Sequence, residues 1–161
     1  MGTGKTLALA AGIGALCGLR TFTPPAVVSR AARSGGLSLR DTQLELLQSR
    51  IAASLLTKSA VGELFADKMP FMISRLGAGS LAGRFLSGAL CGAAIAYGRR
   101  DRAVAGAAGL GGAAAIAGAF AAYHLRRSLG KSSGAPDPVI AILEDAIAVG
   151  GAVAIVRASA D

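Results

Sequence analysis

Charged residues are scarce in this chain of 161 residues, of which Asp, Glu, Lys and Arg together make up only 16%. A soluble domain typically carries about 25% charged residues, which cover its surface. The chain also has no Trp, 4% aromatic residues, two Cys and one His. So few Cys and His residues argue against a disulfide framework or a metal site. The scarcity of charge indicates a membrane protein, with a soluble Ala/Gly-rich helical domain as the minor alternative.

Apolar and small residues fill the space that charge leaves. Apolar residues make up 53% of the chain, 23 residues are Gly, and the mean hydropathy is +0.56. Small residues let helices approach closely in lipid, where burying oily side chains between helices gives no advantage. The net charge of +8 lies in the ends and loops, where basic residues set membrane topology and contact anionic headgroups. We therefore expect membrane lipids as partners and no nucleic acid.

Five apolar segments predict an all-α fold, a polytopic transmembrane helix bundle of about five spans in one domain over residues 1–161. A span takes about 20 predominantly apolar residues, and the second segment is short. The segments are residues 6–32, 51–67, 76–97, 103–125 and 138–156. Between the first two, residues 36–50 mix Leu with charged residues, which predicts either an amphipathic helix at the membrane surface or a solvated loop.

The first segment is interrupted by Pro24 and Pro25, which predicts a broken helix. Because neither proline has an amide hydrogen, the carbonyls of Arg20 and Thr21 lose their helical partners. We expect Thr23 to cap a second half-helix, whose N-terminus would attract an anion beside the donors of Arg20 and Thr21. The alternative is a simple proline kink whose Arg20 pairs with an acidic neighbour.

Charged residues inside the apolar segments are the most informative feature of the sequence. Each costs at least ~2.5–3.5 kcal/mol at a helix centre unless it is paired or hydrated. Leaving Arg30 and Lys58 aside, three cations and four anions inside or just beside the segments nearly balance, which predicts that they meet inside the bundle, as a ligand site or as a structural ion-pair network. They are Arg20, Lys68, Arg84, Glu63, Asp67, Glu144 and Asp145.

The four acidic residues fall into two pairs. Glu63 and Asp67 lie four residues apart on one helix face, where two carboxylates repel unless a cation or a proton lies between them. Arg84 is a candidate partner. The neighbours 144–145 point about 100° apart, so we expect one of them to face an arginine of an earlier span and the other to face a second partner.

Small residues recur four positions apart, a spacing that packs helices within a membrane bundle. The pairs are Gly14 and Gly18, Gly79 and Gly83, and Gly88 and Gly92. The string Gly-Ala-Leu-Cys-Gly occurs at both 14–18 and 88–92, by duplication or by coincidence, and it places Cys17 and Cys91 within apolar runs as small buried residues. The same small-residue faces are compatible with a homo-oligomer.

The distribution of basic residues gives a weak prediction of orientation. With five spans, six cations, Lys5 among them, would lie on one side of the membrane and eight on the other. This difference mildly favours an external N-terminus and also permits insertion in both orientations. The six are Lys5, Lys68, Arg75, Arg126, Arg127 and Lys131. The eight are Arg30, Arg33, Arg40, Arg50, Arg99, Arg100, Arg102 and Arg157.

Five strings, spread in order over nearly the whole chain, resemble a bacterial membrane-protein family known as domain of unknown function 4126. The strings are Gly18–Pro25, Glu63–Pro70, Gly83–Leu90, Tyr123–Arg126 and Leu143–Asp145. The resemblance implies a small multi-pass protein of the bacterial inner (plasma) membrane. It implies no activity, and therefore no functional residues.

The residues favour a small transporter or channel-like protein whose charged intramembrane site binds a small anionic ligand or couples protons. The alternative is a non-transporting membrane scaffold or lipid-binding module whose buried ion pairs are structural. A weaker third hypothesis is an intramembrane enzyme that uses Glu63 and Asp67. No catalytic motif accompanies that pair, so we expect neither an enzyme nor a cofactor, and we expect His124 to lie at the membrane interface.

Overall fold

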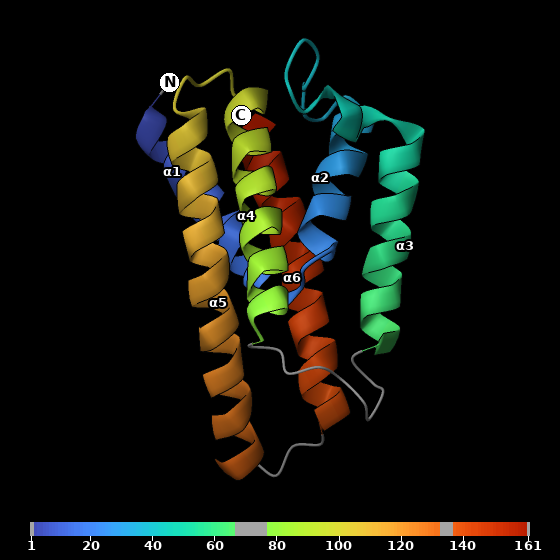
Figure 1. Cartoon of the computed structure of the whole chain (residues 1–161), viewed down its shortest axis with the longest axis vertical. Helices are drawn as coiled ribbons and strands as arrows, with labels where there is room; N and C mark the ends of the chain where they lie inside the picture. The colour runs from blue at the N-terminus through green and yellow to red at the C-terminus, as the bar shows by residue number, and fades with distance from the viewer. Residues whose placement is uncertain (1, 67–76, 133–136, 161) are drawn as a thin grey trace.

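A computed structural model describes residues 2–66, 77–132 and 137–160 of the chain. These residues form α-helices and one short 3-10 helix, with no strand among them (Figure 1), which confirms the all-α fold. The helices are α1 (Thr3–Leu19), α2 (Thr23–Arg33), η1 (Glu45–Gln48), α3 (Arg50–Ala66), α4 (Ala78–Gly98), α5 (Val104–Ser132) and α6 (Asp137–Ala160).

Three of the helices are long and apolar enough to cross a membrane. They are α4, the Val104–Ser128 part of α5 and the Val139–Ala160 part of α6, and they match three of the predicted spans. The other two predicted spans are not matched in this way. Helix α1 is apolar but has only 17 residues, and α3 has 17 residues that include Lys58 and Glu63. The described helices therefore support a membrane protein with three candidate spans.

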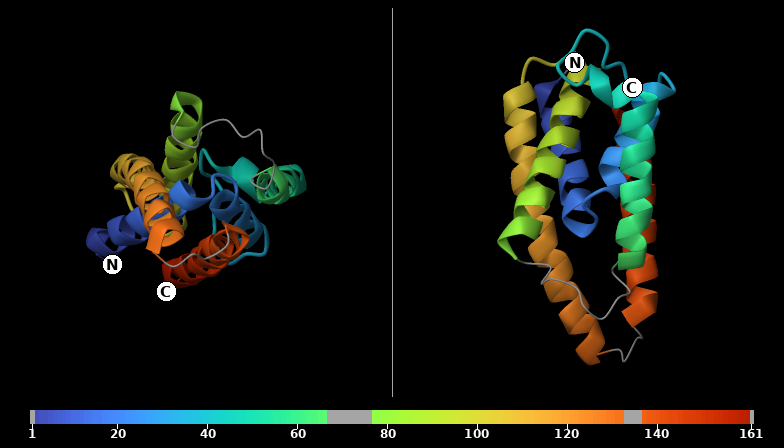
Figure 2. Two further views of the ribbon diagram at one scale, coloured as in Figure 1. Left: turned by 90° about the horizontal axis from the view of Figure 1, so that it is seen from below. Right: turned by 45° about the vertical axis from the view of Figure 1, so that its right-hand side comes forward.

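The first predicted span, over residues 6–32, is instead a hairpin of two helices that begins and ends at one end of the bundle (Figures 1 and 2). At the start of α1, Thr6 Oγ1 lies 3.2 Å from Arg99 Nε, just after α4. Beyond α2, Leu37 packs against Gly98, the last residue of α4. The single broken helix that the prolines predicted is therefore not confirmed. Helices α1 and α2 are separate, and the chain reverses between them at Arg20, which is extended (φ −135°, ψ 121°).

Glycines bring α1, α4 and α5 into backbone contact. A Cβ atom added at Gly14 or Gly88 would overlap the carbonyl oxygen of Gly111 on α5, and one added at Gly18 would overlap that of Ala115. The same holds for Gly92 against α5. Two of the predicted glycine pairs therefore pack inside the bundle, as expected. The third pair, residues 79 and 83, does not, since only a Thr21 methyl group lies within 4 Å of either position.

The two copies of the repeated string pack against the same residue of α5, because Gly14 and Gly88 both meet the carbonyl of Gly111. Cys17 and Cys91 are both fully buried in one apolar cluster, and both are free thiols, as the sequence predicts.

Residues 36–50 do not form the predicted amphipathic helix. Only η1 is helical there, because Leu37 and Leu39 are buried against the bundle and draw the segment over its end.

The connection between α4 and α5 lies at the same end as the start of α1. Thr3 Oγ1 is 3.5 Å from a carboxylate oxygen of Asp101, and that oxygen also accepts the N–H of Ala103 at 3.0 Å. These hydrogen bonds, the backbone one first, hold the pKa of the exposed Asp101 carboxyl below its usual value. This end of the molecule therefore gathers the first residues of α1, the last residues of α2 and the α4–α5 connection.

Candidate functional site

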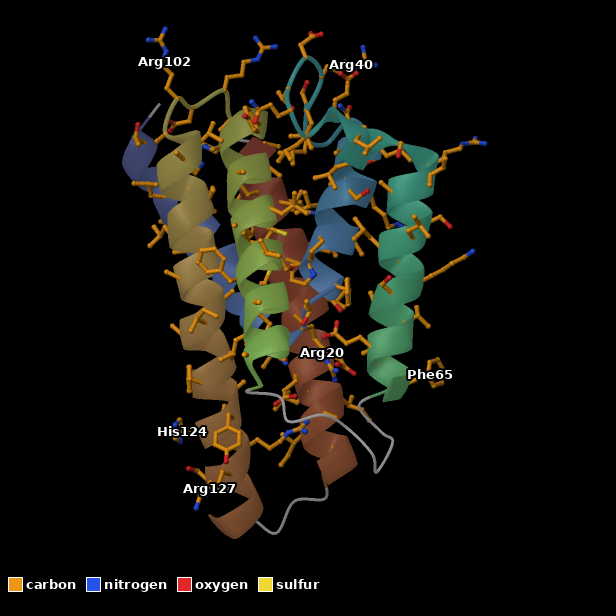
Figure 3. All side chains as sticks on the ribbon, in the orientation of Figure 1. Arg20, Arg40, Phe65, Arg102, His124 and Arg127 are labelled. Atoms are coloured by element: carbon orange, nitrogen blue, oxygen red, sulfur yellow. The ribbon has the colours of Figure 1, made fainter. Side chains whose placement is uncertain are left out.

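The predicted site residues converge on the tip of the α1–α2 hairpin, which we define as residues 20–22. At about 1.5 Å per residue, α1 extends about 25 Å from the end where it begins, a distance close to the ~30 Å hydrocarbon thickness of a bilayer. Arg20 lies in the middle of the bundle (Figure 3) and is 1% exposed. The tip is therefore an interruption between two helices inside the bundle, where the surrounding protein supplies partners for its polar groups.

Arg20 forms an ion pair with Asp145 of α6. Its Nη2 lies 2.6 Å from Asp145 Oδ1, and the two side chains are 2% and 26% exposed. A guanidinium buried in lipid without such a partner would cost several kcal/mol. The pair joins the hairpin tip to α6, as the alternative of a kink with a paired Arg20 predicts.

Glu63 of α3 binds the N-terminus of α2. Its two carboxylate oxygens accept the N–H groups of Thr21 at 2.7 Å and Phe22 at 2.9 Å. Phe22 precedes the first residue of α2, and no side chain of its own caps that end. The predicted cap by Thr23 is therefore wrong. Thr23 is the buried first residue of α2, and the carboxylate of another helix takes the capping place.

The sequence predicted that the N-terminus of the second half-helix would attract an anionic ligand. In the structure the anion at this place is the protein's own Glu63 carboxylate. A carboxylate suits the place because the first N–H groups of a helix have no helical acceptor and carry its positive dipole end. The sequence could not indicate Glu63 for it, because Phe22 and Glu63 are 41 positions apart and are brought together only by the packing of α3 against α2.

Helix α4 supplies donors for the carbonyl groups at the tip. Arg84, 7% exposed, donates from Nη1 to the carbonyl of Gly18 near the C-terminus of α1, where a cation is favoured by the helix dipole. Ser87 Oγ donates to the carbonyl of Thr21 at 2.5 Å. That carbonyl is one of the two that the prolines deprive of a helical partner. Sequence reasoning missed Ser87, although it lies one helical turn after Arg84.

A second ion pair lies closer to the end of the bundle opposite the termini. Arg126 Nη2 of α5 is 2.9 Å from Glu144 Oε2 of α6. Residues 144 and 145 thus face different arginines, as their angular separation predicts, but the sequence did not single out Arg126.

His124 on α5 is exposed, with Tyr123 beside it at 5.5 Å between ring centroids. Asp67 and Lys68 lie outside the described residues.

Glu63 differs from the other acidic residues at the tip. Asp145 and Glu144 pair with arginines, whereas the described contacts of Glu63 are to backbone N–H groups, and no cation pairs with it within residues 2–66, 77–132 and 137–160. Its side chain is half-buried, next to Phe22, which is 40% exposed. Protonation of Glu63 would remove a negative charge from the end of α2 without leaving an unpaired guanidinium behind.

Comparison with known proteins identifies one family. The family model described as "Domain of unknown function (DUF4126)" matches residues 7–159, nearly the whole chain. No curated protein and no solved structure matches the chain.

Proposed function

We propose that this chain, which belongs to the DUF4126 family, is a small channel-like or transporter membrane protein that moves protons past the hairpin tip. Glu63 is the residue that binds and releases the proton. The observation that carries this proposal is a half-buried carboxylate, next to the buried Arg20, whose described partners are backbone N–H groups at a helix end. Ionisable residues within a membrane commonly mark ion and proton pathways.

The other charges at the tip support a division of roles. Arg20 and Arg84 are engaged by Asp145 and by the carbonyl of Gly18, so they are not proposed to bind an external anion. They hold the hairpin in place. Glu63 can exchange a proton with less disturbance, because α2 retains its position through the Arg20–Asp145 pair when Glu63 is neutral.

Proton flux into vesicles tests this proposal. Purified protein is reconstituted into vesicles that contain a pH-sensitive dye, and a potassium diffusion potential set with valinomycin drives protons inward. We expect vesicles with wild-type protein to acidify faster than empty vesicles. We expect Glu63→Gln to lower the rate to that of empty vesicles, because the amide cannot release a proton at neutral pH.

Glu45→Gln is the matched control, since Glu45 is an exposed carboxylate on η1, away from the tip. It should acidify at the wild-type rate. Thermal unfolding in detergent checks that both variants fold. Equal rates for Glu63→Gln and wild type would remove Glu63 from the pathway, and wild-type vesicles no faster than empty ones would sink proton transport altogether.

The second candidate is a membrane scaffold whose charges fix the arrangement of its helices. The pairing of Arg20 with Asp145 and of Arg126 with Glu144 favours it, because paired charges specify helix positions without any transport. The two candidates differ at Glu63. A scaffold predicts a stability change and no flux for Glu63→Gln, whereas proton transport predicts a lost flux in a folded protein.

The hairpin also changes the expected orientation. Because α2 returns toward the start of α1, Lys5 lies at the same end as the eight cations that the sequence analysis placed opposite it, which makes nine at this end. Among the described side chains, Arg126 and Arg127 lie toward the opposite end. The positive-inside rule then supports a cytoplasmic location for both termini. A green fluorescent protein fused to the C-terminus should fluoresce in cells, and alkaline phosphatase fused there should be inactive. The reverse pattern would invert the orientation.

A further inference from the structure

A large cavity lies at the end of the bundle that carries the termini, far from the hairpin tip. Its volume is about 1370 Å³, above the ~300–1,000 Å³ of typical small-molecule pockets. Its three walls are the C-terminal half of α2 with the residues after it, the first half of α3, and the second half of α6. It is distinct from the proton site, because neither Glu63 nor any residue of the tip lines it.

The polar part of this cavity is strongly basic. Among residues 2–66, 77–132 and 137–160, five of its lining residues are cations and none is acidic. Four of these cations lie near the outer ends of the three helices, and Lys58 lies two turns further along α3. The cations are Arg30, Arg33, Arg50, Lys58 and Arg157. Since all five are exposed, this rim presents a concentrated positive charge to an anion.

The deeper part of the cavity is apolar. Val149, Val153 and Val156 follow one face of α6, and Val27 of α2 and Ala53 of α3 stand opposite. Val149 is 47% exposed although it lies inside a candidate span. Through the eight residues from Val149 to Arg157, the α6 wall changes from apolar to basic over about 12 Å. The cavity is therefore amphipathic along the membrane normal.

We propose that this cavity binds an anionic phospholipid of the surrounding membrane, with its phosphate among the arginines and an acyl chain along the valines. Arginine suits a phosphate because its planar guanidinium offers paired donors. The apolar depth argues for a lipid and against a soluble phosphate ester, which has no chain to bury. The cationic rim selects anionic over zwitterionic lipid, and anionic lipids are concentrated in the cytoplasmic leaflet, where the basic end is placed by its charge.

Native mass spectrometry of the full-length protein in mild detergent tests the charge selectivity. The probes are palmitoyl-oleoyl phosphatidylglycerol and phosphatidylcholine, which share their acyl chains. We expect at least tenfold tighter binding of phosphatidylglycerol. The variant Arg30→Gln/Arg157→Gln removes two rim cations from different helices, and we expect it to abolish this preference. Equal binding of the two lipids to wild type would overturn the proposal.

The matched control is Lys5→Gln/Arg102→Gln, which removes the same net charge from exposed positions at the same end that do not line the cavity. Arg102 projects from the α4–α5 connection, on the other side of this end from α2 and α3 (Figure 3). We expect the control to bind phosphatidylglycerol as the wild type does. An equal loss in both variants would show a general surface potential instead of a site.

A second pair of variants tests the apolar depth without any change of charge. Val153→Trp fills the cavity, whereas Ile142→Trp places the same side chain on α6 at an exposed position that does not line it. We expect only Val153→Trp to lose the bound lipid. Glycerol 3-phosphate added in excess should fail to displace the lipid. Displacement by it, or an undiminished lipid complex of Val153→Trp, would overturn the lipid assignment in favour of a soluble phosphate ester or of a surface contact.

Discussion

The two sides of this bundle are held together by different interactions. Helices α1, α4 and α5 touch backbone to backbone through glycine, from Gly14 and Gly88 at Gly111 down to Gly18 at Ala115. Helices α2, α3 and α6 meet through polar contacts at the hairpin tip and diverge around a cavity at the other end. Figure 2, seen along the bundle, places α3 at the periphery.

This difference follows from what lipid leaves available to stabilise helix association. Burying apolar side chains gains little between helices in a bilayer, so close van der Waals packing must stabilise one side. On the other side, a few charged and hydrogen-bonded contacts fix positions without requiring close packing along the whole helix. That side can therefore keep a cavity, and the two proposed functions both reside there.

The largest expected effect on the free energy of unfolding comes from breaking the Arg20–Asp145 ion pair between the hairpin tip and α6. Arg20→Gln alone should lower the free energy of unfolding by about 3–5 kcal/mol, because it leaves Asp145 as an unpaired charge within the bundle. Asp145→Asn should cost a similar amount. The double variant should lose much less than the sum, because it removes both charges. Denaturant unfolding in mixed micelles, followed by circular dichroism, measures all three.

Arg40→Gln is the control for this cycle, since Arg40 is exposed in the connection between α2 and α3 (Figure 3). It should change the free energy of unfolding by less than about 0.5 kcal/mol. Additive losses in the double variant would mean that Arg20 and Asp145 act independently, and the contrast between the two sides of the bundle would then fail.

A smaller effect is expected from the glycine side. Gly111→Ala places a methyl group against the carbonyl oxygen of Gly88, which forces α4 and α5 apart. Overpacking of this kind costs about 1–3 kcal/mol. The same unfolding measurement gives its size, and loss of phosphatidylglycerol binding is not expected, because Gly111 is on the side away from the cavity.

The smallest effects are expected for Gly79→Ala and Gly150→Ala, which serve as controls for Gly111→Ala. Apart from the backbone of its own helix, neither glycine has a neighbouring atom of the described residues within 4 Å of an added Cβ. Both lie within helices, so alanine should be neutral or should stabilise by up to about 1 kcal/mol through its helix propensity. A loss at Gly150 as large as that at Gly111 would show that α6 needs flexible backbone, and that glycine does not act through close packing alone.

Part of the tip was predictable from particular residues. The two prolines identified the break and the carbonyl of Thr21 that needed a donor, and the adjacent carboxylates 144 and 145 predicted two different partners. Ser87 and Arg126 were not predicted, because serine and arginine are common residues and nothing in the sequence links these two to residues 66 and 18 positions away. The pairing of Glu63 with α2 likewise required a knowledge of which helices are neighbours.

The sequence by itself determined that this protein is helical and belongs in a membrane. It also determined that glycines pack its helices together and that its first apolar segment is interrupted. Those properties depend on composition, on local spacing and on the missing amide hydrogens of proline. Only the tertiary structure decided that the chain reverses at Arg20, that the anion at the end of α2 is Glu63, and that the basic residues of three helices surround one cavity. These features depend on contacts between distant segments, and local backbone chemistry does not specify in which direction a chain continues after a break.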